Sequence, residues 1–253
     1  MAIATVVVLF YAEEKQANTE IAEPQISIHL NGESAFLTKN EVLEYLRFNN
    51  LIFGGQKNQD LKIDSVENAL KKLPEVKTVK VYRDFGNAWF IFIQLRNPIA
   101  RIFNQYGESF FLDDEGYTIN ENAEHTARVM VFSGNIPDRF DVQNINTIIN
   151  NDSLKSIHKL DDIYRLSNYV CKDPFLHRLI SQVYLNDKGD FILTPVVGDQ
   201  QIVFGSAFSE KQIKEKFDRL KIFYKEAMPY EGWSTYSLLS VKYDGQIVAT
   251  RRK

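Results

Sequence analysis

The stretch that decides the fold is residues 61–102, LKIDSVENALKKLPEVKTVKVYRDFGNAWFIFIQLRNPIARI. It opens with a short amphipathic segment that Asp64 or Ser65 is expected to cap, and Pro74 ends this predicted helix. Two β-rich runs follow at residues 76–83 and 88–95, separated by residues with turn chemistry. The second run is apolar almost throughout, which predicts a central strand.

The residues before this stretch supply another strand and another helix. Residues 25–30 alternate apolar and polar side chains, which predicts a strand. Thr38 and Glu41 form the Thr-x-x-Glu pattern of a capping box at the start of a helix. The expected order is therefore strand, helix, helix, strand, strand. Pro98 then breaks the pattern before a second set of strands, which predicts two domains divided near residues 97–99.

The rest of the chain predicts a mostly antiparallel sheet with flanking helices, so the fold class is α+β. Asp244-Gly245 between residues 235–243 and 246–250 is the strongest hairpin signal and predicts a two-residue loop. The helix at residues 152–170 is expected to be capped by Asp152 or Ser153, and the helix at residues 209–228 by Ser209. The other expected elements are strands at residues 99–105, 108–113, 117–119, 129–132, 179–185, 191–197 and 201–204, and a weakly patterned helix at residues 134–152.

Five short motifs occur along the chain in a specific order. They are Leu-Pro-Glu-Val at residues 73–76, Arg-Asn-Pro-Ile-Ala-Arg at 96–101, Asp-Pro-Phe-Leu at 173–176, Val-Phe-Gly at 203–205 and Val-Lys-Tyr-Asp-Gly at 241–245. In this order they resemble the extracytoplasmic cell-division family FtsQ, called DivIB in other bacteria, and the first two are similar to its POTRA domain and to its passage into a β-rich domain. Some members carry Arg-Tyr-Asp-Ser-Gly in the last strand, which is one residue longer than the segment here.

The resemblance implies a POTRA domain at residues 24–97 and an FtsQ-type β-domain at residues 98–253. It also implies a non-catalytic scaffold of the bacterial divisome, anchored once in the inner membrane with most of the chain in the periplasm. FtsB and FtsL are the implied partners at the β-domain, and FtsK and the septal peptidoglycan synthase complex are further implied contacts. The alternative is a transport, secretion or chaperone module built on POTRA, which usually needs several such units or a membrane barrel.

The N-terminal segment AIATVVVLFYA at residues 2–12 is apolar but short. A helix that spans a bilayer needs about 20 apolar residues, and no Lys or Arg precedes this run. Composition alone leaves two interpretations, the outer half of a membrane anchor or a buried strand. The charged residues 13–15 and the polar linker through residue 23 favour the anchor, which the resemblance also implies.

The bulk composition excludes some classes of protein. A formal net charge of −3 over 253 residues argues against a general nucleic-acid binder. Cys171 is the single cysteine, which excludes an intrachain disulfide. The four histidines lack metal-ligand spacing, and Cys171 with His177 is a poor nucleophile–base pair because free cysteine is mostly a core residue. We therefore expect no metal, no cofactor and no catalytic centre.

The predicted partner-binding residues lie in the last hairpin and on the preceding helix. By resemblance, Lys242 would pair with a carboxylate of an incoming segment, and Tyr243 would bury its ring against that segment. Four lysines of the helix at residues 209–228 share a face that is either simply solvated or a docking surface for an acidic partner. The expected partner-binding residues are Val241, Lys242, Tyr243, Gln246, Ile247, Lys214 and Lys221.

Overall fold

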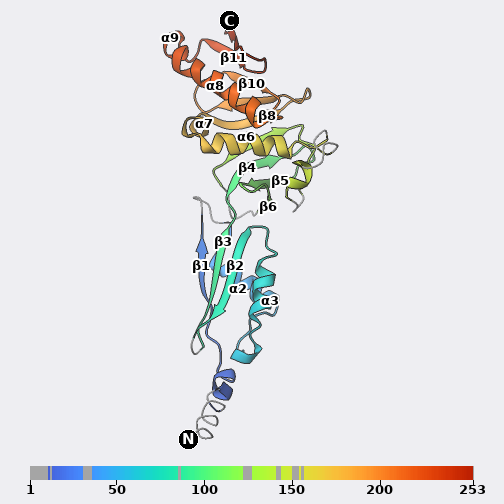
Figure 1. The fold of residues 1–253 in the computed structure, drawn as a ribbon, viewed down its shortest axis with the longest axis vertical. Coiled ribbons are helices and arrows are strands. Elements are labelled where there is room, and N and C mark those ends of the chain that lie inside the picture. Colours follow the sequence, from blue (N-terminus) through green and yellow to red (C-terminus); the bar gives the residue numbers. More distant parts are fainter. Residues whose placement is uncertain are drawn as a thin grey trace. The chain divides into compact units, whose positions relative to one another are not determined.

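The computed structural model describes residues 11, 13–30, 36–84, 87–121, 127–140, 144–149, 154 and 157–252 (Figure 1). These residues divide into two compact units. Unit 1 contains the described residues up to Asn97, and unit 2 contains those from Pro98 onward. Both units combine helices with a sheet, which confirms the predicted α+β class.

Unit 1 is built on a three-stranded sheet with the order β1-β3-β2. Strand β1 pairs with β3 in parallel and β2 pairs with β3 antiparallel, so β3 is central as its apolar run predicts. The predicted order of strand, helix, helix, strand, strand is confirmed, whereas the POTRA assignment stays a prediction. The elements are β1 (Gln25–His29), α2 (Lys39–Phe48), the 3₁₀ turn η1 (Asn58–Asp60), α3 (Ile63–Leu70), β2 (Val76–Arg83) and β3 (Trp89–Leu95).

The core of unit 1 lies between this sheet and its two helices. Alternate residues of β3 point to opposite faces, and the buried set joins side chains from α2 and α3 in one cluster. On the other face Tyr82 stacks on Phe90 and Phe92, with ring centroids 5.2 and 5.5 Å apart. The fully buried members of the core are Val42, Leu46, Val66, Leu70, Ile91 and Ile93.

The two helices of unit 1 begin in different ways. The predicted capping box of α2 is confirmed, because Thr38 Oγ1 accepts from the Glu41 N–H at 3.3 Å and Glu41 Oε2 accepts from the Thr38 N–H at 2.6 Å. The predicted cap of α3 by Asp64 or Ser65 is wrong, because the helix already begins at Ile63. Asp64 therefore lies in the first turn, where a carboxylate favours the positive end of the helix dipole.

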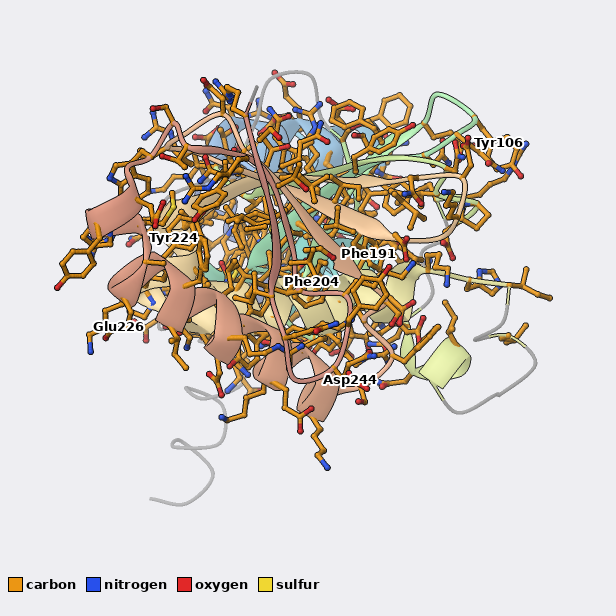
Figure 2. All side chains as sticks on the ribbon, turned by 90° about the horizontal axis from the view of Figure 1, so that it is seen from above. Tyr106, Phe191, Phe204, Tyr224, Glu226 and Asp244 are labelled. Carbon is orange, nitrogen blue, oxygen red and sulfur yellow. The ribbon has the colours of Figure 1, made fainter. Side chains whose placement is uncertain are left out.

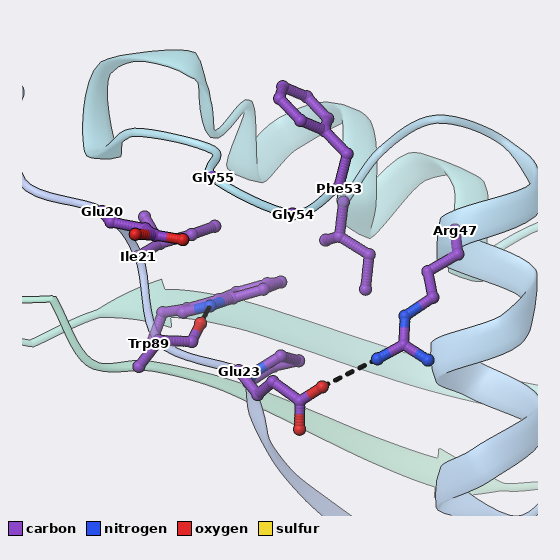
Figure 3. A pocket seen from close by; sticks show the side chains of 11 residues that line it. Glu20, Ile21, Glu23, Arg47, Phe53, Gly54, Gly55 and Trp89 are labelled. Carbon is purple, nitrogen blue, oxygen red and sulfur yellow. Dashed lines mark hydrogen bonds and ion pairs between the residues drawn. The ribbon is translucent and has the colours of Figure 1, made fainter.

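The segment before β1 is attached to unit 1. The predicted anchor lies outside the described residues except for Tyr11, and residues 13–17 are helical. The Ile21 N–H donates to the Gln56 carbonyl at 2.9 Å, and Trp89 Nε1 donates to the Ala22 carbonyl at 2.8 Å. Figure 3 shows Ile21 lying over the Trp89 ring. In the part of the chain that the structure describes, no helix is long and apolar enough to span a bilayer.

Unit 2 contains a nine-stranded sheet with the order β12-β11-β10-β9-β8-β7-β4-β5-β6. Five of its strand pairs are antiparallel and three, β10–β11, β7–β8 and β4–β7, are parallel. The predicted hairpin of β4 and β5 and the predicted meander of β8, β9 and β10 are both present. The strands are β4 (Pro98–Phe103), β5 (Ser109–Asp113), β6 (Thr118–Asn120), β7 (Met130–Gly134), β8 (Ile180–Leu185), β9 (Phe191–Pro195), β10 (Gln201–Gly205), β11 (Tyr236–Ser240) and β12 (Val248–Arg251).

The helices of unit 2 pack on this sheet around one core. In Figure 1, α6 and α8 cross the sheet side by side, and Figure 2 shows Phe191 and Phe204 in the middle of the unit. Phe204 lies 4.8 Å from Phe217 of α8 between ring centroids, and Tyr169 of α6 stacks on Phe217 at 5.4 Å. The helices are α4 (Asn146–Ile149), α6 (Leu160–Lys172), α7 (Pro174–Leu179), α8 (Glu210–Glu226) and α9 (Met228–Glu231).

Two predictions for this region need correction. Of the helix expected from residue 152, Leu154 is helical, residues 157–159 are not, and α6 begins at Leu160. The predicted caps Asp152 and Ser153 lie outside the described residues, and Ile157, expected on the buried face, is 63% exposed. The buried carboxylate of Asp138 explains the late start, because its Oδ2 accepts from the Lys159 N–H at 2.8 Å and acts as a distant cap. Of the helix expected at residues 134–152, the described part is helical at α4 only.

Helix α7 was not expected from the sequence, which places a strand start at residue 179. Asp173 caps it, since its Oδ1 accepts from the N–H groups of Phe175 and Leu176 at 3.0 and 3.1 Å. Pro174 occupies the first helical position, where its missing N–H is not needed. The same Asp-Pro pair thus ends α6 and begins α7.

Replacing Thr38 by Ala should lower the free energy of unfolding of unit 1 by about 1 kcal/mol, because the Thr38 hydroxyl no longer accepts from the Glu41 N–H or donates to the Glu41 carboxylate. The measurement is urea denaturation followed by Trp89 fluorescence in a Trp233→Phe background, since Trp89 is the tryptophan buried in unit 1. Thr38→Ser keeps the hydroxyl and is the matched control. Equal stabilities of the Ala and Ser variants would contradict the capping role.

Candidate functional site

The last hairpin lies at one end of the nine-stranded order. Strand β12 pairs antiparallel with β11, with Ser240 opposite Val248, and among the described strands β11 is its one neighbour in the sheet. The predicted two-residue loop is wrong, because residues 241–247 lie outside both strands. Asp244 and Gly245 still form the turn, and Gly245 has the positive φ of 73° that such a turn requires.

The hairpin opens because its first residues bind elsewhere. The Val241 N–H donates to the Val203 carbonyl of β10 at 3.0 Å, so the chain beyond β11 continues along β10. Arg219 of α8 donates from Nη2 to the carbonyls of Val241 and Tyr243, each at 3.2 Å. These bonds replace the hydrogen bonds that a tight hairpin would form, and they fix the loop against α8.

Two lysines, Lys242 of the loop and Lys216 of α8, bind at and near the ends of β9 and β10. Lys242 Nζ lies 2.7 Å from Asp190 Oδ2, and this hydrogen bond raises the pKa of the Lys242 ammonium. Its side-chain stem covers Gly205, where a Cβ atom would lie only 2.8 Å from Lys242 Cγ. Lys216 is 1% exposed, donates to the Ser206 carbonyl at 2.7 Å and lies 4.9 Å above the Phe204 ring centroid. Burial lowers the pKa of the Lys216 ammonium to about 8.

Strand β12 and the residues just before it have one solvent-exposed face and one face packed on the core. Ile247 and Ala249 pack against the core of unit 2, whereas Gln246, Val248 and Thr250 are exposed. Cations at its end are paired within the chain, Arg251 with Glu231 at 2.8 Å and Arg252 with Asp199 at 3.3 Å. Strand β12 is therefore short and packed against the core on one face, and no other described strand pairs with its outer side.

The structure brings five of the predicted partner-binding residues onto one loop. Tyr243 is 54% exposed, and Gln246 is also exposed. Val241, in contrast, is fully buried, so it supports the loop and has no surface to offer a partner. The five residues are Val241, Lys242, Tyr243, Gln246 and Ile247.

The two lysines predicted on α8 are ion-paired within the chain. Lys214 Nζ lies 2.5 Å from Asp218, and Lys221 Nζ lies 2.9 Å from Asp173 and 3.5 Å from Asp218. Lys221 therefore joins α8 to the cap of α7. Because carboxylates of the chain already pair with both lysines, their positive charges are less available to an acidic partner. The sequence did not point to Arg219 or Asp190. Arg219 binds loop carbonyls and Asp190 binds Lys242, and these partners are remote from them in sequence.

Cys171, the one cysteine considered as a nucleophile, is not activated in this structure. Cys171 lies on α6, with its thiol donating weakly to the Ile99 carbonyl at 3.8 Å. Burial raises the pKa of the Cys171 thiol, which keeps it protonated, whereas a catalytic cysteine needs a lowered pKa. His177 is exposed on α7.

Comparison with known proteins places this region in a family. The family described as FtsQ/DivIB, C-terminal related, matches residues 97–250, which include unit 2 through β11 and most of β12. This chain belongs to the FtsQ/DivIB family. The cell division protein FtsQ of Rickettsia felis is 32% identical over 96 residues, covering 31% of this chain and 36% of that protein. The FtsQ proteins of Rickettsia conorii and Rickettsia prowazekii match to the same extent.

The match to these relatives spans about a third of their length. Family and relatives together indicate a cell-division protein, which agrees with the resemblance carried by the sequence motifs.

The buried ammonium of Lys216 should make the free energy of unfolding depend on pH. Its ammonium is buried and titrates at about pH 8 in the folded chain, against 10.5 when exposed. The charged form therefore destabilises the fold below pH 8, and this cost disappears as pH rises from 8 to 10.5. Relative to Lys216→Met, the wild type should gain on the order of 2 to 3 kcal/mol over this range, measured by denaturant unfolding at each pH. A constant difference between the two proteins would contradict the assignment.

Proposed function

We propose that this protein is a non-catalytic, membrane-anchored scaffold of the bacterial divisome, with most of its chain in the periplasm. It links early and late division proteins by protein–protein contacts, partly by adding a partner strand to β12. The observation that carries this proposal is that β12 is the terminal strand of the nine-stranded order, with no described strand paired to its outer side, within the region that matches the FtsQ/DivIB family. The lack of an activated nucleophile at Cys171 supports the non-catalytic part.

An exposed strand edge binds a partner through main-chain hydrogen bonds, and pockets for alternate side chains add specificity. Here Val248 and Thr250 alternate with core-facing residues along β12, so an added strand would lie beside exposed side chains. The strand is four residues long and ends in cations, features that limit unselective pairing between sheet edges.

The loop before β12 would supply the side-chain contacts. Tyr243 is exposed and attached to a backbone that Arg219 holds in place, which lowers the entropy cost of binding. Lys242 is already paired with Asp190, so a partner carboxylate would share this lysine with Asp190. We propose FtsB-type and FtsL-type proteins as the partners at this edge, and FtsK and the septal peptidoglycan synthase complex as further contacts.

Proline substitution tests the strand edge. Of two successive residues in β12, one directs its N–H to β11 and the other directs it to the free edge. Of Val248→Pro and Ala249→Pro, the variant that keeps the wild-type melting temperature is therefore the one that lacks an outward N–H. That variant should bind the periplasmic segment of the FtsB-type protein from the same organism at least about tenfold more weakly by calorimetry. Unchanged affinity would rule out strand addition at β12.

Tyr243→Ala tests the side-chain anchor. Loss of a buried aromatic anchor typically costs about 2 kcal/mol or more, which is over tenfold in affinity. The melting temperature should stay close to that of the wild type, because the ring is 54% exposed. The control is Tyr106→Ala, which removes a ring that is 51% exposed and lies well apart from Asp244 in Figure 2. If both variants bind equally well, Tyr243 is not an anchor.

A further inference from the structure

One end of unit 1 carries two exposed aromatic rings on a single loop. Helix α2 ends at Phe48, and residues 48–55 form what we term the Phe48–Phe53 loop. Phe48 is 86% exposed and Phe53 is 54% exposed, and Figure 3 shows the Phe53 ring directed away from Trp89 of the core. Two large apolar side chains held in water so close together in sequence indicate a contact surface.

This loop lies where the N-terminal segment joins unit 1. The Asn58 N–H donates to the Thr19 carbonyl at 3.0 Å, just beyond the loop. Ile21 of the N-terminal segment and Phe53 of the loop line one small cavity together with Trp89 (Figure 3). The loop is therefore fixed beside the segment that leads back to the apolar N-terminal run.

The connection to that run is short. From Tyr11 to Thr19 the chain advances eight residues, which span roughly 12 Å at about 1.5 Å per residue in a helix. Residues 13–17 are helical. The headgroup layer on each side of the hydrocarbon core is itself roughly 5–7 Å thick. With residues 2–12 in a bilayer, the Phe48–Phe53 loop thus lies within about one side-chain length of the headgroup layer, and any tilt of the connecting helix brings it closer.

The charge of this end favours an apolar contact over attraction to anionic lipid. Residues 11–24 and 47–60 together contain five carboxylates and three basic side chains. Arg47 is paired with Glu23 at 2.7 Å, and Lys57 Nζ donates to Asn18 Oδ1 at 3.2 Å. A polybasic segment would bind anionic headgroups, whereas exposed rings without excess positive charge bind by burying apolar area in the interface.

We propose that the rings of Phe48 and Phe53 insert at the boundary between headgroups and acyl chains and dock this end of unit 1 on the lipid surface. The proposal rests on the proposed membrane anchor, which brings the bilayer to this end. The anchor alone would leave unit 1 free to swing on its connecting segment. A second contact from the Phe48–Phe53 loop fixes the orientation of unit 1 against the membrane.

The test uses the full chain reconstituted in phosphatidylcholine vesicles. Trp233→Phe is the parent protein, which leaves Trp89 as the sole native tryptophan, and the parent emission is subtracted. The reporters Phe48→Trp and Phe53→Trp keep an aromatic ring at each position. Their emission is compared between ordinary lipid and lipid brominated in the upper part of one acyl chain, which quenches tryptophan at short range.

Each reporter should lose at least about half of its emission in brominated lipid, because a ring buried roughly 5–10 Å into the interface lies beside the bromines. The matched control is Leu30→Trp, at a side chain that is 42% exposed and follows the far end of β1. This control should lose no emission. Circular dichroism melting checks that the three variants fold. Full emission from both loop reporters, or equal losses at all three positions, would overturn the proposal.

Salt distinguishes insertion from electrostatic adsorption. The losses should be the same in phosphatidylcholine and in phosphatidylcholine–phosphatidylglycerol vesicles and should persist at high salt, which screens exposed charges. Losses that require phosphatidylglycerol and disappear at high salt would show adsorption through basic side chains, which contradicts insertion of the rings.

Failure of the anchor is separable from failure of the ring contact. Val8→Trp, within the apolar run, reports insertion of the anchor by the same quenching. If Val8→Trp is quenched and the two loop reporters are not, the anchor stands and the ring contact is wrong. If the loop reporters are quenched and Val8→Trp is not, the ring contact stands and the membrane-anchored part of the proposed function fails.

Discussion

The candidate binding edge depends on one interaction, the pair of hydrogen bonds from Arg219 to the carbonyls of Val241 and Tyr243. Val241 and Lys242 also bind Val203 and Asp190, and the Arg219 bond to Tyr243 holds the backbone next to the Asp244-Gly245 turn. The guanidinium suits this role because its donors form a rigid fork, whereas a lysine ammonium is a point charge. With the loop fixed to α8, β12 returns beside β11 in a defined register and Tyr243 is held at the surface.

The charged residues of unit 2 serve mainly to hold elements together. Lys221 joins α8 to the cap of α7, Lys242 joins the loop to the start of β9, and Arg252 joins the chain end to the β9–β10 turn. Exposed ion pairs contribute little stability individually, so their main consequence is positional. They also neutralise these charges within the chain.

Local patterns predicted the elements whose causes are local. Both strands of the β2–β3 hairpin and the Thr38–Glu41 box were readable, because alternation and capping involve neighbours in sequence. The start of α6 could not be predicted, because its cap comes from Asp138, which is remote in sequence. The prediction of a tight final hairpin was wrong, because Arg219 and Val203 bind the backbone groups that such a hairpin would pair. Of the site, the exposed Tyr243 could be named in advance, whereas Arg219 and Asp190 are brought to the loop by tertiary packing.

Hydrogen–deuterium exchange with and without the FtsB-type periplasmic segment tests the central claim, that this protein assembles partners through the edge of β12. The account predicts slower exchange in residues 241–252 on complex formation, because outward amides of β12 become hydrogen-bonded to the added strand. Exchange in β1 of unit 1, Gln25–His29, should stay unchanged. Protection confined to another surface, with residues 241–252 exchanging as in the free protein, would contradict the account.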